Sequence, residues 1–388
     1  MTGRLPEDAE SRGGGMVGTD RPGVAASPAG DLGGDGAGDP GRRAAAYPRL
    51  ARHRLTVGGH RVGVAVGGQG VPLVLASGLL LTDRLYLQTL SRLAACGFRV
   101  VAVDVAGSGI SGDGKGLDEY GRLLGQVLDA LEVERAVLAG HSLGGRLVAE
   151  LAARRPEWVV ALLLVGASVG APWDRLVRLV GYAPPSVGVL GAMLLADTLG
   201  TVPFARDLSQ AAKLSRLAVP VMLGHLGAPW RLLGPGLSAL YAAASAPLLD
   251  RVGAAGTPVV VVHGDYDLVV PMATARDAAR RTAGELVVVH GAAHSFLLQD
   301  PETLPAIVRE LLDGRLGEAR ARAVAGAGLG PDAPLAAVDE AFAPAGSRLR
   351  LLGPPGPDPR PVPAPRPPHY TWSRTSLTGP TDRAAARR

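Results

Sequence analysis

The chain has 388 residues, of which 47% are hydrophobic and 4% aromatic, enough for one large domain or two small ones. A single cysteine, Cys96, excludes an intramolecular disulfide framework and a cysteine-rich zinc site. The net charge of +5 does not predict nucleic-acid binding by the core, because residues 315–388 alone hold 11 arginines against six acidic residues.

The two ends of the chain differ in composition from its middle. Residues 1–46 contain 12 glycines and four prolines with almost no hydrophobic periodicity, so we expect a disordered leader. Residues 317–388 are rich in Pro, Ala and Arg, and we expect them to be mostly extended or disordered, with at most a short helix at Leu335–Phe342. A folded domain is therefore expected over residues 47–316.

Apolar segments give an expectation about localisation. The N-terminal region has no continuous apolar stretch of the kind that a secretory signal needs. No uncharged apolar segment of 20 residues occurs further along the chain, and such a segment would be needed for a membrane-spanning helix. We therefore expect a cytoplasmic protein.

Between the two flanks, strand patterns alternate with helix patterns. The first two strands are expected at 54–57 and 61–66, as an antiparallel pair joined by a turn at Gly58-Gly59. Six further strands, rich in Val, Ile, Leu and Ala, are expected at 72–76, 99–104, 136–139, 160–165, 258–262 and 285–289. Helices are expected at 86–96, 117–131, 145–155, 273–282 and 301–312. This alternation predicts an α/β fold with about eight strands in a mostly parallel sheet flanked by helices.

About 80 residues without a clear strand, 168–249, separate the sixth and seventh expected strands. This segment is too long for an ordinary connection, so we expect a helical cap over the carboxyl edge of the sheet. Its stretch 181–205 carries one charged residue, Asp197, and a pocket roofed by it would favour apolar acyl or alkyl groups. Alternatively, these side chains merely pack the cap onto the sheet, or the cap touches a membrane.

A serine between glycines stands where the fifth expected strand meets a helix. In "AVLAGHSLGGRLVAE", the residues Gly140-His141-Ser142-Leu143-Gly144 fit the pattern G-x-S-x-G. A serine on such a sharp turn needs small neighbours, because its backbone is strained and adjacent segments approach closely. An ordinary strand–helix turn can contain the same residues, but the strand–turn–helix context favours a nucleophile.

A serine nucleophile needs a base within hydrogen-bond reach and a carboxylate that orients the base. The stretch "HGDYDLVVP" after the seventh strand supplies Asp265 and Asp267, and "HGAAHSFLLQDPE" after the eighth supplies His290 and His294. Loops at the carboxyl ends of parallel strands converge on one edge of the sheet, so an Asp and a His from these loops can meet Ser142.

The elbow, the stretches "GDYDLVVP" and "GAAHSFLLQDPE", and their order Ser…Asp…His resemble the α/β-hydrolase superfamily over about residues 52–314. The resemblance implies an α/β-hydrolase fold with Ser142 as nucleophile, Asp267 as the orienting acid and His294 as general base. Asp265 is the alternative acid.

The same resemblance implies an oxyanion hole made of two backbone N–H groups. One is that of Leu143, directly after the serine. The other comes from "LASGLLLTD", where many members of the superfamily have His-Gly and this chain has Ser77-Gly78. Leu79 is the expected donor there, and Leu80 is the alternative.

These observations predict a serine hydrolase (EC 3.1.1) that cleaves a carboxylic ester, or a related acyl bond, of an apolar small molecule through an acyl-enzyme. No cofactor is expected, and no His/Asp/Glu cluster with metal spacing is found. The same triad also serves lactonases, C–C hydrolases, acyltransferases and cofactor-free haloperoxidase-like enzymes, and a non-catalytic ligand-binding protein can keep the fold. The sequence does not define an oligomeric state.

Overall fold

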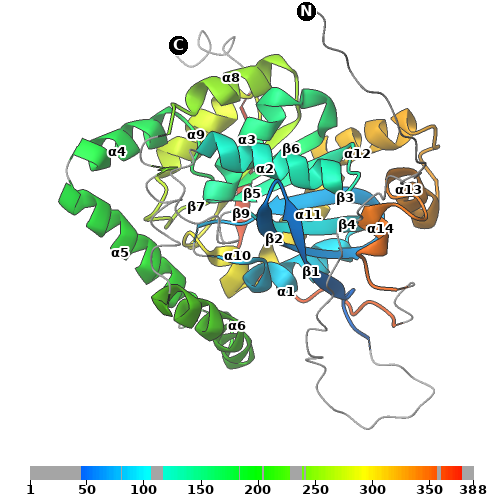
Figure 1. The fold of residues 1–388 in the computed structure, drawn as a ribbon, viewed down its shortest axis with the longest axis horizontal. Helices are drawn as coiled ribbons and strands as arrows, with labels where there is room; N and C mark the ends of the chain where they lie inside the picture. The colour runs from blue at the N-terminus through cyan, green and yellow to red at the C-terminus, as the bar shows by residue number, and fades with distance from the viewer. Residues whose placement is uncertain are drawn as a thin grey trace, which may run out of the picture.

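A nine-stranded sheet forms the centre of the molecule (Figure 1). The computed structural model describes residues 45–79, 81–105, 117–182, 184–202, 205–227, 238–239, 242–355 and 360–377. The strands are β1 (Leu50–Val57), β2 (His60–Gly68), β3 (Val71–Ala76), β4 (Phe98–Asp104), β5 (Ala136–His141), β6 (Val159–Val165), β7 (Val259–Gly264), β8 (Glu285–Val289) and β9 (Trp372–Ser376). They lie side by side in the order β1-β2-β4-β3-β5-β6-β7-β8-β9.

The sheet is parallel in its middle and antiparallel at both edges. Strands β3 to β8 pair in parallel with one another, whereas β1, β2 and β9 join the sheet in antiparallel pairs. Gly58 and Gly59 connect β1 to β2 with φ values of +55° and +81°, which a two-residue hairpin turn of type I′ requires. The eight predicted strands and this turn are therefore confirmed.

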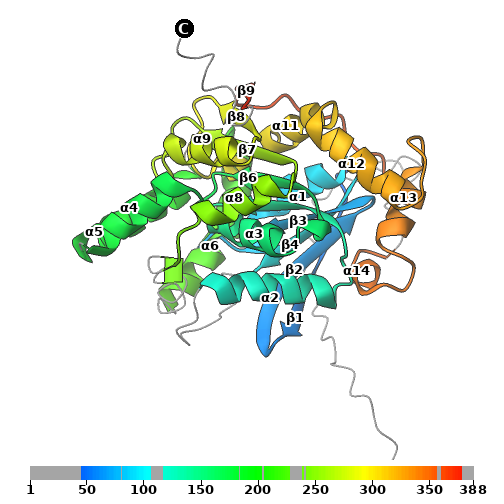
Figure 2. The same cartoon turned by 90° about the horizontal axis from the view of Figure 1, so that it is seen from above.

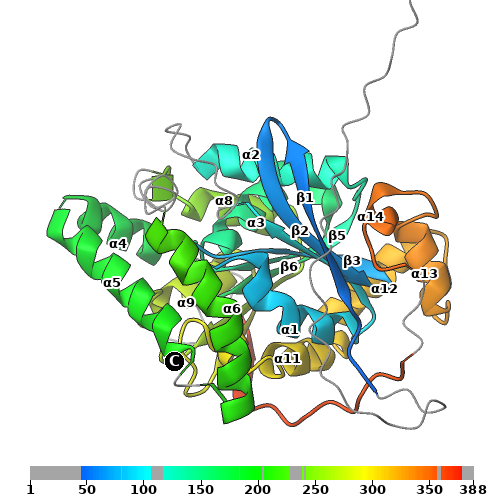
Figure 3. The ribbon, with the colours of Figure 1, turned by 60° about the horizontal axis from the view of Figure 1, so that its bottom comes forward.

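Helices cover both faces of the sheet, as Figure 3 shows. One face is covered by α2 (Leu117–Ala130), α3 (Leu143–Arg154), α8 (Ala246–Ala254) and α9 (Met272–Arg281). The other is covered by α1 (Asp83–Ala94), α10 (Phe296–Gln299), α11 (Thr303–Leu312) and α12 (Arg315–Gly326). A short 3₁₀ helix, Pro156–Trp158, leads into β6. Side chains alternate between the two faces along each strand, so Val74 packs in one core layer and Leu73 and Leu75 in the other.

The segment between β6 and β7 is helical, as predicted for residues 168–249. It contains α4 (Ala171–Tyr182), α5 (Pro184–Gly200) and α6 (Leu208–Gly227), and none of its described residues lies in a strand. Helix α4 packs against α9, and α6 packs against α1 and α10. In the described ranges, no helix combines the length and the apolar character that a bilayer-spanning segment needs.

The expectation of a mostly extended or disordered segment at 317–388 is wrong for its described part, and so is the domain boundary at residue 316. Helix α12 continues to Gly326, α13 (Leu335–Phe342) and α14 (Arg348–Leu351) follow, and β9 pairs with β8. The predicted short helix coincides with α13. Composition misled because the prolines lie between these helices and not inside them, while alanine and arginine favour helix. Residues 1–44 and 378–388 lie outside the described residues.

A buried ion pair fastens α13 to the sheet, at the end of the molecule opposite to α4 and α5 (Figure 2). The fully buried carboxylate of Asp339 accepts hydrogen bonds from Arg99 Nε at 2.8 Å and Arg99 Nη2 at 2.6 Å. It also accepts one from the backbone N–H of Gly70 at 2.8 Å. Arg99 lies in β4 and Gly70 in the turn between β2 and β3, so one carboxylate joins the C-terminal segment to two points of the sheet.

Replacing this carboxylate tests the packing of the C-terminal segment. We expect Asp339→Ala to lower the free energy of unfolding by about 3–5 kcal/mol, because it leaves the Arg99 guanidinium buried without a counter-charge. The control Asp332→Ala removes an exposed acid from the same segment and should change it by less than about 0.5 kcal/mol. Urea denaturation measures both, and equal stability of the two variants would contradict the packing of α13 on the sheet.

Candidate active site

Ser142 occupies a strained turn between β5 and α3. Its φ of +54° and ψ of −122° are unusual for a residue with a side chain and cost on the order of 1–3 kcal/mol. Backbone hydrogen bonds hold this conformation. The N–H of Ser142 donates to the carbonyl of Val165 in β6, and its own carbonyl accepts from the N–H groups of Gly145 and Ser168, all at 3.0 Å.

The glycines of the G-x-S-x-G pattern are needed because backbone segments approach closely there. A Cβ added at Gly144 would collide with the backbone of Ala76 at the end of β3, and a Cβ at Gly140 would collide with the backbone of Gly144. The expectation that this turn needs small neighbours is thus met by its geometry.

Asp267 and His294, from the loops after β7 and β8, are joined by a hydrogen bond. His294 Nδ1 lies 2.7 Å from Asp267 Oδ2, and both side chains are buried. The other carboxylate oxygen, Oδ1, accepts from the backbone N–H groups of Val269 and Val270 at 2.9 and 2.8 Å. The carboxylate is therefore held on one side by its own loop while the other side orients the imidazole.

Asp265, the alternative acid, has different partners. Its Oδ1 accepts from the backbone N–H of Gly291 at 2.7 Å, and its Oδ2 lies 3.2 Å from His290 Nδ1. These contacts are exposed to solvent. Asp265 therefore shapes the turn after β8, and Asp267 is the carboxylate that is hydrogen-bonded to His294.

The second ring nitrogen of His294 is buried and unpartnered. Within the described chain, no hydrogen bond reaches Nε2, so none joins it to the hydroxyl of Ser142. The ring nevertheless lies beside the elbow, because its centroid is 4.9 Å from that of His141, the residue before Ser142. Hydrogen bonds between catalytic groups are often long before substrate binds. With Nδ1 bonded to Asp267, Nε2 is the nitrogen that can accept a proton.

The opposite charges of Asp267 and His294 lower the pKa of the carboxylate and raise that of the imidazole. Burial raises the pKa of Asp267, but the charge and the hydrogen bond of His294 outweigh it and bring the pKa below its usual value. Burial lowers the pKa of His294, whereas the Asp267 carboxylate, with a further contribution from Asp197, raises it above the usual 6.5. The imidazole is thereby made a stronger base than a free histidine.

A chain of buried hydrogen bonds connects the loop after β3, the elbow and the loop of His294. The backbone N–H of Gly78 donates to the Tyr86 hydroxyl oxygen at 3.2 Å, and that hydroxyl lies 2.8 Å from His141 Nδ1. His141 Nε2 lies 3.1 Å from the carbonyl of His294. Because a carbonyl can only accept, Nε2 carries the proton of His141 and Nδ1 accepts from Tyr86.

Burial and the neighbouring His294 lower the pKa of His141 to about 3, so this histidine stays neutral and keeps its place in the hydrogen-bond chain. Tyr86 lies on α1, and no motif in the sequence marks it. It is a positioning residue that sequence reasoning missed.

The two expected oxyanion donors lie on segments that border Ser142. Leu143 is the first residue of α3, and the first N–H groups of a helix have no partner within the helix. Leu79 follows Gly78, where an added Cβ would lie 3.1 Å from the Cβ of Ser142. Leu80, the alternative donor, lies outside the described residues.

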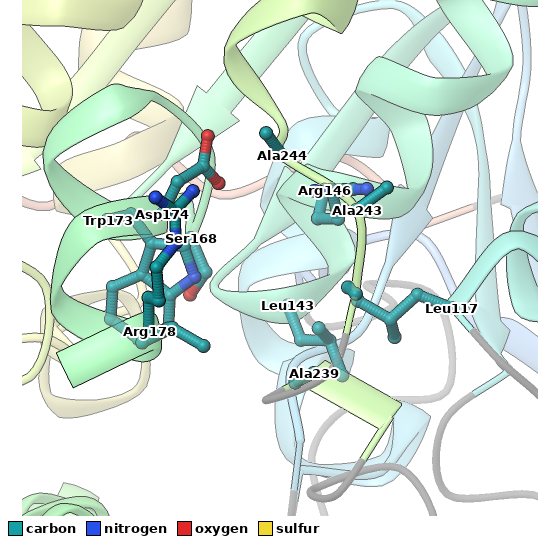
Figure 4. A pocket seen from close by; sticks show the side chains of 12 residues that line it. Leu117, Leu143, Arg146, Ser168, Trp173, Asp174, Arg178, Ala239, Ala243 and Ala244 are labelled. Atoms are coloured by element: carbon teal, nitrogen blue, oxygen red, sulfur yellow. The ribbon is translucent and has the colours of Figure 1, made fainter. Parts of the chain in front are cut away.

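A cavity of about 140 Å³ adjoins the elbow on the side of the helical insertion (Figure 4). Its lining residues are Leu117, Leu143, Arg146, Ser168, Trp173, Asp174, Val177, Arg178, Ala239, Ala242, Ala243 and Ala244. None of them belongs to the apolar stretch 181–205 that was expected to roof the pocket. The described residues contain no group of three or more His, Cys, Asp or Glu side chains able to hold a metal ion.

A hydrogen bond joins the insertion to the residue after His294. Ser295, directly after His294, donates its hydroxyl to Asp197 Oδ2 at 2.5 Å. Asp197 lies on α5 and is the single charged residue of the stretch 181–205. Helix α5 therefore places a negative charge near the imidazole of His294, which sequence reasoning did not foresee.

Removing this charge should change the titration of His294. The charged or titratable groups that act on its imidazole are Asp267, Asp197, His141 and His263. We expect Asp197→Asn to lower the pKa of His294, because a negative charge that favours the imidazolium is lost. NMR titration of the ring measures this pKa.

The matched control Asp313→Asn removes an exposed charge at the end of α11 and should leave the titration of His294 unchanged. An identical His294 pKa in the native protein and in Asp197→Asn would contradict the placement of α5 beside this loop.

Comparison with known proteins assigns the family. The family model described as alpha/beta hydrolase fold matches residues 71–301. A relative from Mycobacterium phage D29, named "Putative non-heme haloperoxidase", is 35% identical over 250 residues, which cover 63% of this chain and 88% of that protein. The monoacylglycerol lipase of Mycolicibacterium smegmatis is 27% identical over 241 residues, which cover 59% of this chain and 82% of the lipase.

A solved structure, the 2-hydroxy-6-oxo-6-phenylhexa-2,4-dienoate hydrolase of Rhodococcus sp. strain RHA1, is similar with a TM-score of 0.53 at 19% identity. The match covers 69% of this chain and 100% of that one. The likeness concerns the fold alone. Because the family model spans more than half of the sequence, the chain belongs to the α/β-hydrolase family.

Proposed function

We propose that the protein is a serine hydrolase that cleaves a carboxylic ester, or a related acyl bond, of a small molecule. Ser142 is the nucleophile, His294 the general base and Asp267 the acid that orients the base. The observation that carries this proposal is the buried hydrogen bond between Asp267 and His294, which leaves Nε2 unpartnered beside the strained turn of Ser142. A strained, glycine-flanked serine near an oriented imidazole suits acyl transfer.

Each group has a defined part in the proposed reaction. His294 Nε2 takes the proton of the Ser142 hydroxyl while Oγ attacks the carbonyl carbon, and the N–H groups of Leu143 and Leu79 stabilise the oxyanion. The imidazolium then protonates the leaving alcohol as the C–O bond breaks, which gives an acyl-enzyme. Water, deprotonated by the same Nε2, releases the acid and restores the hydroxyl of Ser142. Asp267 keeps the Nδ1–H tautomer and stabilises the imidazolium throughout.

Two further observations favour an ester with an aliphatic part. The monoacylglycerol lipase relative matches over most of its own length, and its name states an ester substrate. Seven of the twelve described residues that line the cavity beside the elbow are Leu, Val or Ala, whose side chains bind hydrocarbon. An apolar part of the substrate therefore stays a prediction. The residues that support it line the cavity beside the elbow and lie outside the stretch 181–205.

The name of the phage relative favours a second candidate, a cofactor-free haloperoxidase-like activity that uses the same triad. Bromination of an organic acceptor in the presence of hydrogen peroxide and bromide would reveal it. Loss of this activity in Ser142→Ala would assign it to the same site.

A fluorophosphonate probe tests the nucleophile directly. We expect the native protein to be phosphonylated at Ser142, and mass spectrometry of its peptides to locate the adduct there, because only an activated serine reacts quickly. Ser142→Ala should not react, and Ser215→Ala, which changes a serine on α6, should react like the native protein. A folded native protein that stays unlabelled would favour a non-catalytic ligand-binding member of the fold.

The two carboxylates of the β7 loop allow a matched comparison. Asp267→Asn should lower kcat on an activated ester by about 10⁴, because the amide no longer holds the Nδ1–H tautomer of His294. Asp265→Asn, which alters an exposed turn, should keep kcat within about tenfold. Steady-state kinetics and thermal melting of both variants give the answer, and the reverse order of the two activities would assign the acid to Asp265.

A further inference from the structure

Arg146 is a buried cation one helical turn after Ser142. Its side chain is 4% exposed and lines the cavity beside the elbow together with Leu143. Residues three apart on a helix share a face, so the side chain of Arg146 lies on the face of α3 that also presents Leu143. Figure 4 shows Arg146 on the same side of this cavity as Leu117, across from Trp173 and Arg178.

The guanidinium of Arg146 has no counter-charge in contact. In the described chain, no hydrogen bond and no ion pair reaches it, and its Nε is closed off from solvent without a partner. Within the described chain the two Nη atoms also make no hydrogen bond, and the side chain is part of the cavity wall. Burial lowers the pKa of this arginine, yet an arginine remains charged in proteins. A buried, unpaired cation is costly, and such a group calls for an anionic partner.

Three acids, Glu150, Asp174 and Asp118, act on Arg146 through their charge, but in the described chain none forms a hydrogen bond or an ion pair with it. Glu150, one turn further on α3, accepts Arg154 Nη2 on its Oε1 at 2.6 Å, and its Oε2 is buried without a hydrogen bond. Asp174 accepts from the N–H and the hydroxyl of Ser245, at 2.8 and 2.6 Å, and from a third donor in the next residue. These acids act on Arg146 only from a distance. The missing contact partner can therefore come from a ligand in the cavity.

We propose that Arg146 binds a carboxylate of the substrate, so that the preferred esters are monoesters of dicarboxylic acids or similar esters with a negative charge on an aliphatic arm. This inference rests on the proposed function and adds the substrate class. The planar guanidinium fork matches a carboxylate, which carries the single charge that one arginine balances. The other lining arginine, Arg178, is exposed and lies on the opposite wall.

The apolar lining fits the rest of such a substrate. Leu117, Val177 and the alanines at 242–244 can enclose methylene groups between the acyl carbon at Ser142 and a carboxylate at Arg146. The four-residue step from Ser142, the N-cap of α3, to Arg146 advances by about 6 Å along the helix axis, a distance that a short aliphatic chain spans.

A pair of esters of equal shape tests this assignment. Methyl hydrogen adipate carries a carboxylate where methyl 6-methylheptanoate carries an isopropyl group. We expect Arg146→Gln to lower kcat/KM for the adipate ester by about 10- to 100-fold, the range for a lost hydrogen bond to a charged group, and to change the neutral ester less than about threefold. Arg175→Gln, which removes an exposed arginine of α4 outside the cavity lining, should leave both values unchanged. An equal loss on both esters would overturn the proposal.

Two readouts separate this inference from catalysis and from folding. Calorimetric titration of methyl hydrogen adipate into Ser142→Ala and into Ser142→Ala/Arg146→Gln measures binding without turnover, and only the first should bind it. Arg146→Met should keep or raise the melting temperature of the unliganded protein, because an unpaired buried charge is replaced by an apolar chain. Equal affinity in the two Ser142→Ala backgrounds, or a large loss of stability in Arg146→Met, would make Arg146 a structural residue.

Discussion

The backbone strain at Ser142 is the constraint on which the site depends. A φ of +54° with a side chain present is tolerated only where the surroundings fix it from several directions. Here β6 supplies the acceptor Val165, the first turn of α3 supplies Gly145, and the loop after β6 supplies Ser168. One of these contacts comes from the fully buried neighbouring strand β6 and the other two from segments that adjoin β5 and β6, so the packing around the sheet keeps the serine on its turn. The rest of the proposed chemistry needs groups that arrive at this fixed point.

Buried hydrogen bonds bring the other loops to that point. The chain from Gly78 through Tyr86 and His141 to the carbonyl of His294 connects the loops after β3, β5 and β8. Asp267 adds the loop after β7. Removing one member would leave buried polar atoms unpaired, which makes the arrangement cooperative. The hydrogen bond between Ser295 and Asp197 connects this arrangement to the helical insertion. A movement of α5 would therefore displace the loop that carries His294.

The sequence predicted those parts that a local pattern encodes. Apolar runs marked β1 to β8, and the glycines around Ser142 marked the turn, because each depends on neighbouring residues. Strand β9, "WSRTS", has no apolar pattern, since its side chains are mostly exposed at the sheet edge. Residues alone could not choose between Asp265 and Asp267, both just after β7, because the choice depends on where the histidine loop lies. Neither Tyr86 nor Arg146 carries a local signal, since the hydrogen bonds of Tyr86 and the role proposed for Arg146 depend on tertiary contacts.

Electrostatics gives a reason why a cation would be built into the first turn of α3. In the proposed ester cleavage a negative oxyanion would develop next to the N–H of Leu143, and a substrate carboxylate about 6 Å away would repel it by roughly 3 kcal/mol at an effective dielectric constant of 20. The positive end of the helix dipole favours both charges, but it acts mainly within the first turn. A guanidinium in contact with the substrate carboxylate neutralises its charge and so removes its repulsion of the oxyanion. With Arg146 in contact with its carboxylate, an anionic ester would be cleaved faster than a neutral ester of the same shape, because the charge-assisted contact persists in the transition state.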